Sequence, residues 1–266
     1  INFKDNILDK EKIKKYVDSL LFNISYNYDI SLKIITDLDE IFLDRIFKRY
    51  KFRYTMSTIQ LEPPRLTYIS ELTEQYHMAI SSEDPFIQFI GFYHIMEYFF
   101  EEIYKENIIE QVKEIILNPG FSSKRKKDIV KIIDFINKKM VSENNSLAGS
   151  ERKALELTLE KYVKIEDIIE KLKDYKDNLE EYYKTTKVTF SDGDVFDLNN
   201  DKEIFKKMSS RIYKTRNSLV HSKSNEIRLK ERGIYKPFKD SKELLKEIPL
   251  MRCISEEIII KSSKEL

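Results

Sequence analysis

The 266-residue chain contains few of the residues that break helices or cross-link a fold. It holds 5 glycines, 6 prolines, one cysteine and no tryptophan. So few glycines and prolines favour long helices over a fold with many tight turns. The single cysteine, Cys253, excludes an internal disulfide and a zinc site built from cysteines. It lies in an apolar helical pattern, so we expect a buried thiol in a reducing, cytoplasmic setting.

The chain also lacks an excess of charge of one sign and lacks a long apolar run. Its 47 Lys and Arg residues nearly balance its 46 Asp and Glu residues, for a formal net charge of +1. Any contact with RNA or DNA therefore needs a local basic patch. The most apolar run, Phe86–Phe100, is too short to cross a membrane and includes Gln88, His94 and Glu97. We expect no membrane segment and recognise no signal peptide.

Residues 1–62 are predicted to form a short N-terminal α or α/β segment. An apolar stripe at helical spacing predicts a helix from about residue 11 to 25. Weak alternation over residues 28–36 indicates a short strand, and residues 37–52 indicate a second helix. Because the chain begins at Ile1 rather than at a methionine, we consider two origins, a trimmed product and a piece of a longer protein.

Residues 63–266 are predicted to form one helical domain, so the expected fold class is mainly α. Asp84 and Pro85 suit the start of a helix that is apolar nearly all round, and we expect this helix to be central and to continue to about Glu106 or Ile116. Alternating apolar residues around Asp192 and Gly193 predict a small β-hairpin over residues 188–198. Further helices are predicted at about residues 65–80, 121–140, 151–184, 201–220 and 241–263.

One stretch, KTRNSLVHSK over Lys214–Lys223, contains candidate catalytic residues. It holds one of the three histidines, His221, five residues after Arg216 and four after Asn217. On an ideal helix Asn217 and His221 share a face, whereas Arg216 and His221 lie about 140° apart. Arg216 therefore reaches the histidine through its long stem, through a local distortion, or across to a second copy.

The direction of His221 follows from the apolar stripe of the same predicted helix. This stripe leaves the histidine pointing away from the core, towards solvent or a partner. The stripe consists of Phe205, Met208, Ile212 and Leu219.

The pattern R-N-x-x-x-H late in a helical domain resembles the signature of the HEPN superfamily. That signature is an arginine, four to six residues and a histidine, often with a polar residue after the arginine. The run DPFIQFIGFYHIMEYFF resembles the first HEPN helix of a branch found in bacterial antiphage defence proteins, and ELLKEIPLMRCISEEIIIKSS resembles its closing helix. The resemblance spans about residues 66–266, leaves residues 1–60 unexplained, and implies a HEPN-like bundle with a helical insertion at about 140–185.

The resemblance implies a metal-independent endoribonuclease that works as a homodimer and acts as a toxin-like effector of antiviral defence. The 2′-OH of RNA attacks the adjacent phosphate, giving a 2′,3′-cyclic phosphate and a 5′-OH end. His221 can serve as base or acid because imidazole titrates near neutrality. Arg216 supplies a permanent planar charge for phosphate oxygens, and Asn217 orients the phosphate or the histidine.

Several further residues are candidates for supporting roles. The resemblance places Glu97 beside Arg216, where its carboxylate could hold the guanidinium. Basic residues near the motif and at a predicted helix start are weaker candidates for RNA phosphates, with a solvated basic face as the alternative. These are Lys214, Arg211, Lys223, Lys124, Arg125, Lys126 and Lys127.

The other candidates give no cofactor and leave one alternative open. The spacing of the aspartates between residues 192 and 201 does not match a calcium loop, and no glycine-rich phosphate loop is present, so we expect no metal and no cofactor. We expect His94 in the core and His77 on the surface. The alternative function is a catalytically inactive HEPN module that binds a partner protein or a nucleotide. The expected partners are RNA, a second copy and a regulatory or defence-system protein.

Overall fold

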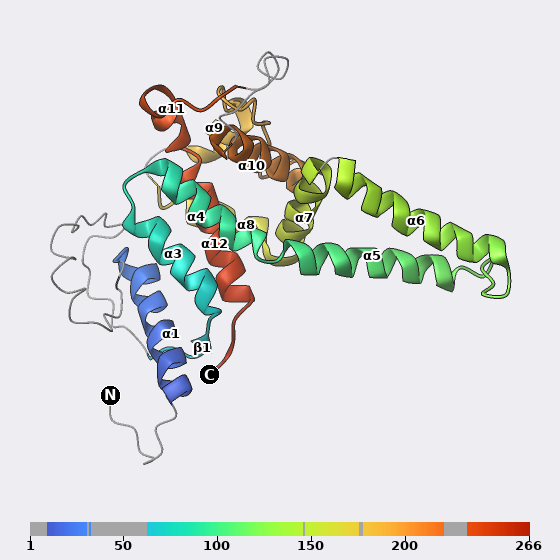
Figure 1. The fold of residues 1–266 in the computed structure, drawn as a ribbon. Coiled ribbons are helices and arrows are strands. Elements are labelled where there is room, and N and C mark those ends of the chain that lie inside the picture. Colours follow the sequence, from blue (N-terminus) through green and yellow to red (C-terminus); the bar gives the residue numbers. More distant parts are fainter. Residues whose placement is uncertain (1–9, 31, 33–62, 146, 176–177, 221–232) are drawn as a thin grey trace. The chain divides into compact units, whose positions relative to one another are not determined.

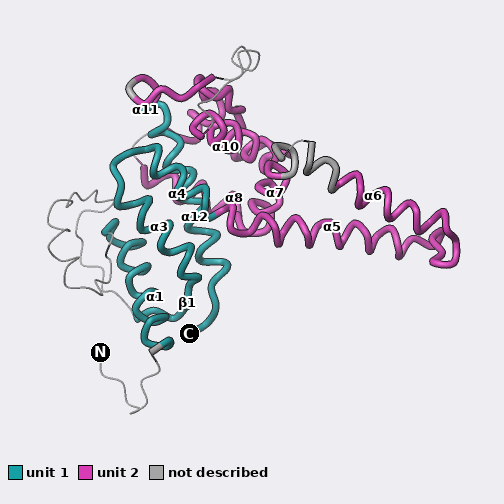
Figure 2. The backbone as a smooth tube through the Cα atoms, in the orientation of Figure 1, with its two compact units in different colours: residues 1–95, 241–266 teal, residues 96–240 magenta. Residues whose placement is uncertain are grey.

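The computed structural model describes residues 10–30, 32, 63–145, 147–175, 178–220 and 233–266. Nearly all regular structure in these residues is helical, which confirms the mainly α class (Figure 1). The chain divides into two compact units, residues 1–95 with 241–266, and residues 96–240 (Figure 2). This division differs from the expected boundary after residue 62. No helix in the described residues is both long enough and apolar enough to cross a membrane.

The first unit is built from α1 (Lys10–Tyr28), α3 (Ser70–Ser81), α12 (Ile248–Lys261) and most of α4 (Pro85–Glu97). The predicted N-terminal helix is confirmed by α1, which packs against α3 through Phe22 and Tyr76, whose ring centroids lie 5.4 Å apart. The strand and helix expected between residues 28 and 52 lie almost wholly outside the described residues.

Helix α4 begins where the sequence predicts. The Asp84 carboxylate accepts a hydrogen bond from the backbone N–H of Phe86 at 2.9 Å, and Pro85 is the first helical residue. Contrary to the expectation of one long helix, α4 ends at Glu97 and α5 (Phe100–Leu117) begins after two intervening residues. The expectation of a core His94 is wrong, because this side chain is exposed.

A buried charged cluster joins three elements of the first unit. Arg252 of α12 forms ion pairs with Glu256 at 2.8 Å and with Asp29, which follows α1. Asp29 has φ 55°, a left-handed conformation that aspartate tolerates better than most residues. The hydroxyl of Tyr76 on α3 donates to Glu256 at 2.8 Å, and burial, with the Glu256 charge, raises the tyrosine pKa well above its usual value. Because these charges are buried, each depends on its partners.

The two named strands are not those predicted from the sequence. Residues Leu66–Thr67 (β1) pair antiparallel with Lys264–Glu265 (β2), so the helix predicted from residue 65 begins at Ser70. The predicted hairpin at 188–198 is reduced to a single antiparallel bridge between Val188 and Gly193. Beyond the bridge, the Phe196 N–H donates to the carbonyl of Tyr183 instead of continuing a ladder.

The second unit holds the remaining helices. They are α5, α6 (Lys126–Asn145), α7 (Leu147–Tyr162), α8 (Ile165–Leu172), α9 (Leu179–Thr185), α10 (Ile204–Val220) and the start of α11 (Pro237–Leu244). The stretch expected as an insertion is helical, but α7 packs against α5, α6 and α10, and its Leu155 and Leu159 are fully buried. This part of the stretch therefore belongs to the core of its unit.

His77 makes the stability of the first unit dependent on pH. It is half-buried rather than at the surface, its Nδ1 lies 2.8 Å from the Ser25 hydroxyl of α1, and burial lowers its pKa to about 4. Since the unfolded pKa is about 6.5, the unfolded chain binds more protons between these pH values. We therefore expect a stability loss on the order of 2 kcal/mol as the pH falls from 7 to 4.5.

Urea unfolding at both pH values measures this loss in the wild type and in His77→Gln, where it should be smaller. The control is His94→Gln, which alters an exposed histidine, and the loss in His77→Gln should be smaller than in this control. An equal loss in wild type and His77→Gln would contradict the assignment.

Candidate functional site

Helix α10 carries the predicted motif and is more deeply buried than its apolar stripe indicates. Met208, Ile212 and Leu219 of the predicted stripe are buried, and Phe205 is half-buried. Every residue from 208 to 213 is buried, including polar ones on the side opposite the stripe. The helix is therefore enclosed by other segments, and its exposed surface lies mainly towards its ends.

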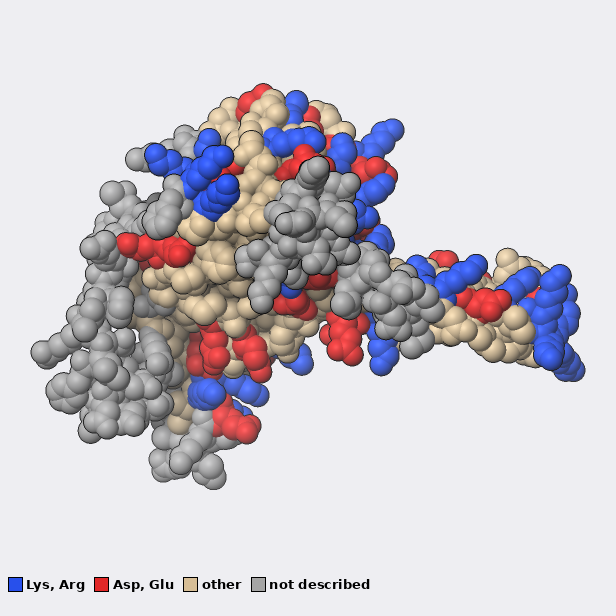
Figure 3. Space-filling model, turned by 45° about the horizontal axis from the view of Figure 1, so that its top comes forward, with Lys and Arg blue, Asp and Glu red and all other residues tan. Residues whose placement is uncertain are grey.

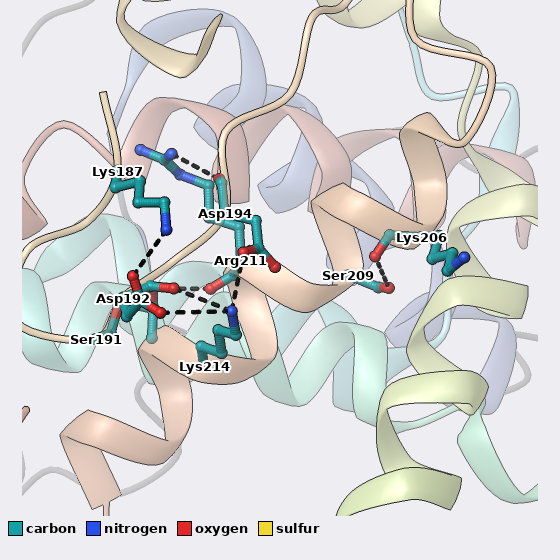
Figure 4. A network of polar contacts seen from close by, with 9 residues as sticks. Lys187, Ser191, Asp192, Asp194, Lys206, Ser209, Arg211 and Lys214 are labelled. Carbon is teal, nitrogen blue, oxygen red and sulfur yellow. Dashed lines mark hydrogen bonds and ion pairs between the residues drawn. The ribbon is translucent and has the colours of Figure 1, made fainter. Parts of the chain in front are cut away.

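Arg211 is the main polar anchor of α10. Its side chain is 0% exposed and donates a hydrogen bond to the Thr186 carbonyl at 2.8 Å. It donates a second one to the Asp194 carbonyl at 2.9 Å (Figure 4). Its guanidinium carbon lies 5.2 Å from the ring centroid of Tyr182 and 5.3 Å from that of Tyr183. The predicted contact of Arg211 with RNA is wrong, because a guanidinium enclosed by carbonyls and aromatic rings cannot reach a phosphate.

Lys214, almost one full turn further along α10 than Arg211, faces an acidic turn. Its ammonium lies 2.9 Å from the Asp194 carboxylate and 3.1 Å from the Asp192 carbonyl (Figure 4). Burial acts to raise the pKa of Asp194, but hydrogen bonds from Ser210 and Lys214 outweigh it and lower that pKa. An RNA phosphate at Lys214 would approach these carboxylates, so the surroundings disfavour the predicted RNA contact.

Arg216 and Asn217 lie near the C-terminal end of α10 and contact each other. Nη1 of Arg216 donates to Oδ1 of Asn217 at 3.2 Å, and Nη2 lies 3.4 Å from Glu151 and 3.8 Å from Glu97. The side chain of Arg216 is 19% exposed. The structure thus brings together three predicted residues, Arg216, Asn217 and Glu97, and one that was not predicted, Glu151.

The two glutamates reach the arginine from different helices. Glu97 ends α4 and its side chain is 41% exposed, so it is not the buried carboxylate that the surrounding apolar run indicated. Glu151 lies in the first turns of α7, in a stretch rich in Glu and Lys residues at similar spacing. Only the packing of α7 against α10 distinguishes Glu151 from the other acidic residues of that stretch.

His221 and Lys223 lie outside the described residues. The described residues that precede and follow them have defined contacts. Val220 ends α10, and the Tyr235 N–H donates to the Ser218 carbonyl at 3.3 Å. Gly233 packs so closely on Phe190 that a Cβ atom would lie 1.9 Å from its carbonyl oxygen. The close approach of the Gly233 backbone to Phe190 therefore requires a glycine at this position.

The basic run at residues 124–127 lies where α5 and α6 are joined. Arg125 forms an ion pair with Asp128 at 2.8 Å and donates to the Gly120 carbonyl. Asp128 also accepts from the Ser122 N–H at 3.0 Å and so ties the preceding turn to the first turn of α6. Arg125 therefore has a structural role in this turn. Lys124, Lys126 and Lys127 are exposed, and their RNA contact stays a prediction.

Comparison with known proteins adds no relative to this picture. No family model, no curated protein and no solved structure matches the chain. Within the described ranges, no group of three or more His, Cys, Asp and Glu side chains is arranged to hold a metal ion. The case for a function therefore depends on the residues of the motif and on their surroundings.

Replacing the buried guanidinium tests its anchoring role. Arg211→Met removes two part-buried hydrogen bonds from a charged donor, each worth about 1.5–3 kcal/mol, and weakens the aromatic packing. We expect a loss of about 3–5 kcal/mol in the free energy of unfolding. Lys206→Met is the matched control, because Lys206 lies on the same helix and its side chain is 55% exposed. Equal stability of the two variants in urea would show that Arg211 is not an anchor.

Proposed function

We propose that the protein is a HEPN-type, metal-independent endoribonuclease that acts in the cytoplasm as a toxin-like effector of antiviral defence. Arg216, Asn217 and His221 would form its catalytic group. One observation carries the proposal: a mostly buried guanidinium, held by two carboxylates, lies beside Asn217 near the end of α10 and five residues before a histidine. In the proposed mechanism this cation binds the phosphate of the RNA and stabilises the negative charge that develops on it.

The contacts of Arg216 suit a residue that exchanges partners. Charge-assisted hydrogen bonds between guanidinium and carboxylate are typically about 2.7–2.9 Å long. The Arg216 Nη2 atom lies 3.4 Å from Glu151 and 3.8 Å from Glu97, which is longer than this range, so the two carboxylates hold the guanidinium by charge at these distances. An RNA phosphate offers two oxygens that can pair with the planar donor edge of the Arg216 guanidinium at shorter distances than these. We infer that Glu97 and Glu151 are positioning residues.

Asn217 acts mainly on the arginine in this proposal. Its side chain is buried, at 8% exposure, and its Oδ1 accepts the hydrogen bond from Arg216. The amide therefore fixes the plane of the guanidinium. This refines the wider role expected from the sequence, which included direct orientation of the phosphate or the histidine.

His221 supplies the proton transfer. As a base it takes the proton of the 2′-OH, which attacks the adjacent phosphorus, and an acid protonates the departing 5′ oxygen. In the proposed homodimer a second copy brings a second histidine to the cleft, so base and acid come from different chains. The bond from phosphorus to the 5′ oxygen breaks, leaving a 2′,3′-cyclic phosphate and a 5′-OH end.

Cleavage of total cellular RNA in EDTA tests the function, with the 3′ ends mapped. We expect cyclic-phosphate ends from the wild type and a loss of at least about 100-fold in rate for His221→Ala, since general acid–base catalysis contributes about 10²–10⁴-fold. Arg216→Lys should lose about tenfold or more because lysine lacks the planar donor edge. Lys206→Ala, an exposed change on α10, is the control.

Two outcomes would contradict the proposal. Full activity of His221→Ala would remove the histidine from the mechanism. If the wild type cleaves no RNA, either in vitro or when expressed in infected cells, the alternative of a catalytically inactive regulatory module is favoured instead.

Glu151 is tested by separating kcat from KM. Glu151→Gln keeps the shape of the side chain and removes one of the two negative charges beside Arg216. We expect kcat to fall by about 3- to 10-fold because the guanidinium is less well oriented, while KM stays the same or falls because its charge is less neutralised. Glu156→Gln on the same helix, whose carboxylate pairs with Lys153 at 2.7 Å, is the control. Unchanged kcat in Glu151→Gln would rule out the positioning role.

A further inference from the structure

The α5–α6 hairpin exposes aliphatic side chains that an isolated protein surface seldom groups together. Three of these side chains lie on α5 and three lie on α6. They are Ile109 (44% exposed), Ile116 (48%), Leu117 (79%), Ile129 (38%), Val130 (40%) and Ile133 (50%). Single exposed apolar residues need no explanation, but a group of this kind typically marks an interaction surface.

Four of these residues form one row along one face of the hairpin. Ile109, Ile116 and Ile133 directly follow the half-buried Ile108, Ile115 and Ile132, and Ile129 directly follows the buried Asp128. Each isoleucine is therefore turned by about 100° from the inner side of its helix, in the same rotational sense. When two helices run antiparallel, side chains rotated from the inner sides of both helices by the same angle and in the same sense point to the same face of the pair. We call Ile109, Ile116, Ile129 and Ile133 the isoleucine row.

On α5, the row continues a stripe that contacts α7 nearer the root of the hairpin. Glu102, Glu106, Ile109, Lys113 and Ile116 follow a spacing of three and four residues and so lie along one stripe of α5. Lys161, near the end of α7, pairs with Glu106 of that stripe at 2.8 Å. Beyond this contact the stripe carries the exposed Ile109 and Ile116, with Lys113 between them. Helix α7 thus contacts the root of the hairpin, and the outer part of the hairpin offers a surface on which another helix can pack.

Charge around the row favours an acidic occupant. Residues 109–133, which hold the row, contain six basic and three acidic residues, for a net charge of +3. One of the acidic residues, Asp128, is buried and paired with Arg125. Figure 3 shows the Lys and Arg side chains gathered at the end of the hairpin. Towards the root, Glu106 and Glu110 adjoin Ile109, so the basic charge is confined to the outer part of the row. A partner helix can place its acidic residues at that outer part alone, whereas a uniformly anionic lipid surface would also face the two glutamates.

We propose that the isoleucine row is the docking surface for an acidic amphipathic helix of a partner protein. The partner helix lays apolar residues at helical spacing onto the four isoleucines and directs Asp and Glu side chains to the lysines at the end of the hairpin. The row spans seven residues of α5, or ~10 Å, which is about two helical turns, so an occupant of two or more turns covers it. This inference is independent of the proposed ribonuclease function.

A designed peptide tests the surface on the full chain. The probe is a fluorescent helical peptide of about 18 residues, ~27 Å long, with one leucine stripe and otherwise mostly glutamate, and its twin has lysine in place of each glutamate. We expect micromolar binding of the acidic peptide by anisotropy and at least tenfold weaker binding of the lysine twin. Ile116→Glu with Ile133→Glu should weaken binding of the acidic peptide by at least about tenfold.

The matched control places the same two glutamates off the row. Leu117→Glu with Val130→Glu alters aliphatic residues that are also exposed, and binding should stay within about threefold of wild type. Both double variants should melt within about 3 °C of wild type, because exposed positions contribute little to stability. A large drop in melting temperature for the row variant alone would show that the isoleucines belong to the fold and would overturn the proposal.

The remaining outcomes also decide the matter. No binding of the acidic peptide, equal binding of the lysine twin, or equal weakening by both double variants would each refute an acidic helix on this row. Sedimentation with vesicles of phosphatidylserine and phosphatidylcholine, without peptide binding, would assign the surface to lipid instead.

Discussion

The buried guanidinium of Arg211 is the interaction on which the second unit depends. It bonds to the carbonyls of Thr186 and Asp194, which lie on either side of the turn that carries Asp192. Since the two carbonyls belong to one irregular segment and the arginine to α10, a single side chain ties that segment to the helix. A charge without water is costly unless its donors are satisfied, so the arrangement tolerates little displacement. The position of Arg216, five residues further along α10, follows from this anchoring.

Buried arginines serve both units in related ways, while Arg216 differs from them. Arg252 joins the end of α1 to α12 through Asp29 and Glu256, and its side chain is 11% exposed. Arg216 is somewhat more exposed, at 19%, and its carboxylate partners lie at longer distances. Arg211 and Arg252 are enclosed by their units, whereas Arg216 keeps 19% of its side chain exposed. The proposed chemistry depends on this exposed part of the guanidinium.

The hairpin of α5 and α6 shows how one element can combine two kinds of surface. Its inner side is partly buried against the neighbouring helix and, near its root, against α7. Its outer part carries an apolar row beside a basic end, and within that end Arg125 and Asp128 are used to close the turn. Structural and interaction roles are thus divided among neighbouring residues of the same basic run, which composition alone does not distinguish.

Local patterns were sufficient for the helices, the start of α4 at Asp84 and Pro85, and the membership of Arg216 and Asn217 in one helix, because periodicity and capping depend on residues a few positions apart. They were not sufficient for the pairing of β1 with β2, the burial of Arg211 or the place of Glu151. Each of these brings together groups that are distant in the chain, and lysine-, arginine- and glutamate-rich stretches look alike until packing selects one side chain. Burial is a property of the assembled core, so the same residue type became an anchor at Arg211 and a candidate catalytic group at Arg216.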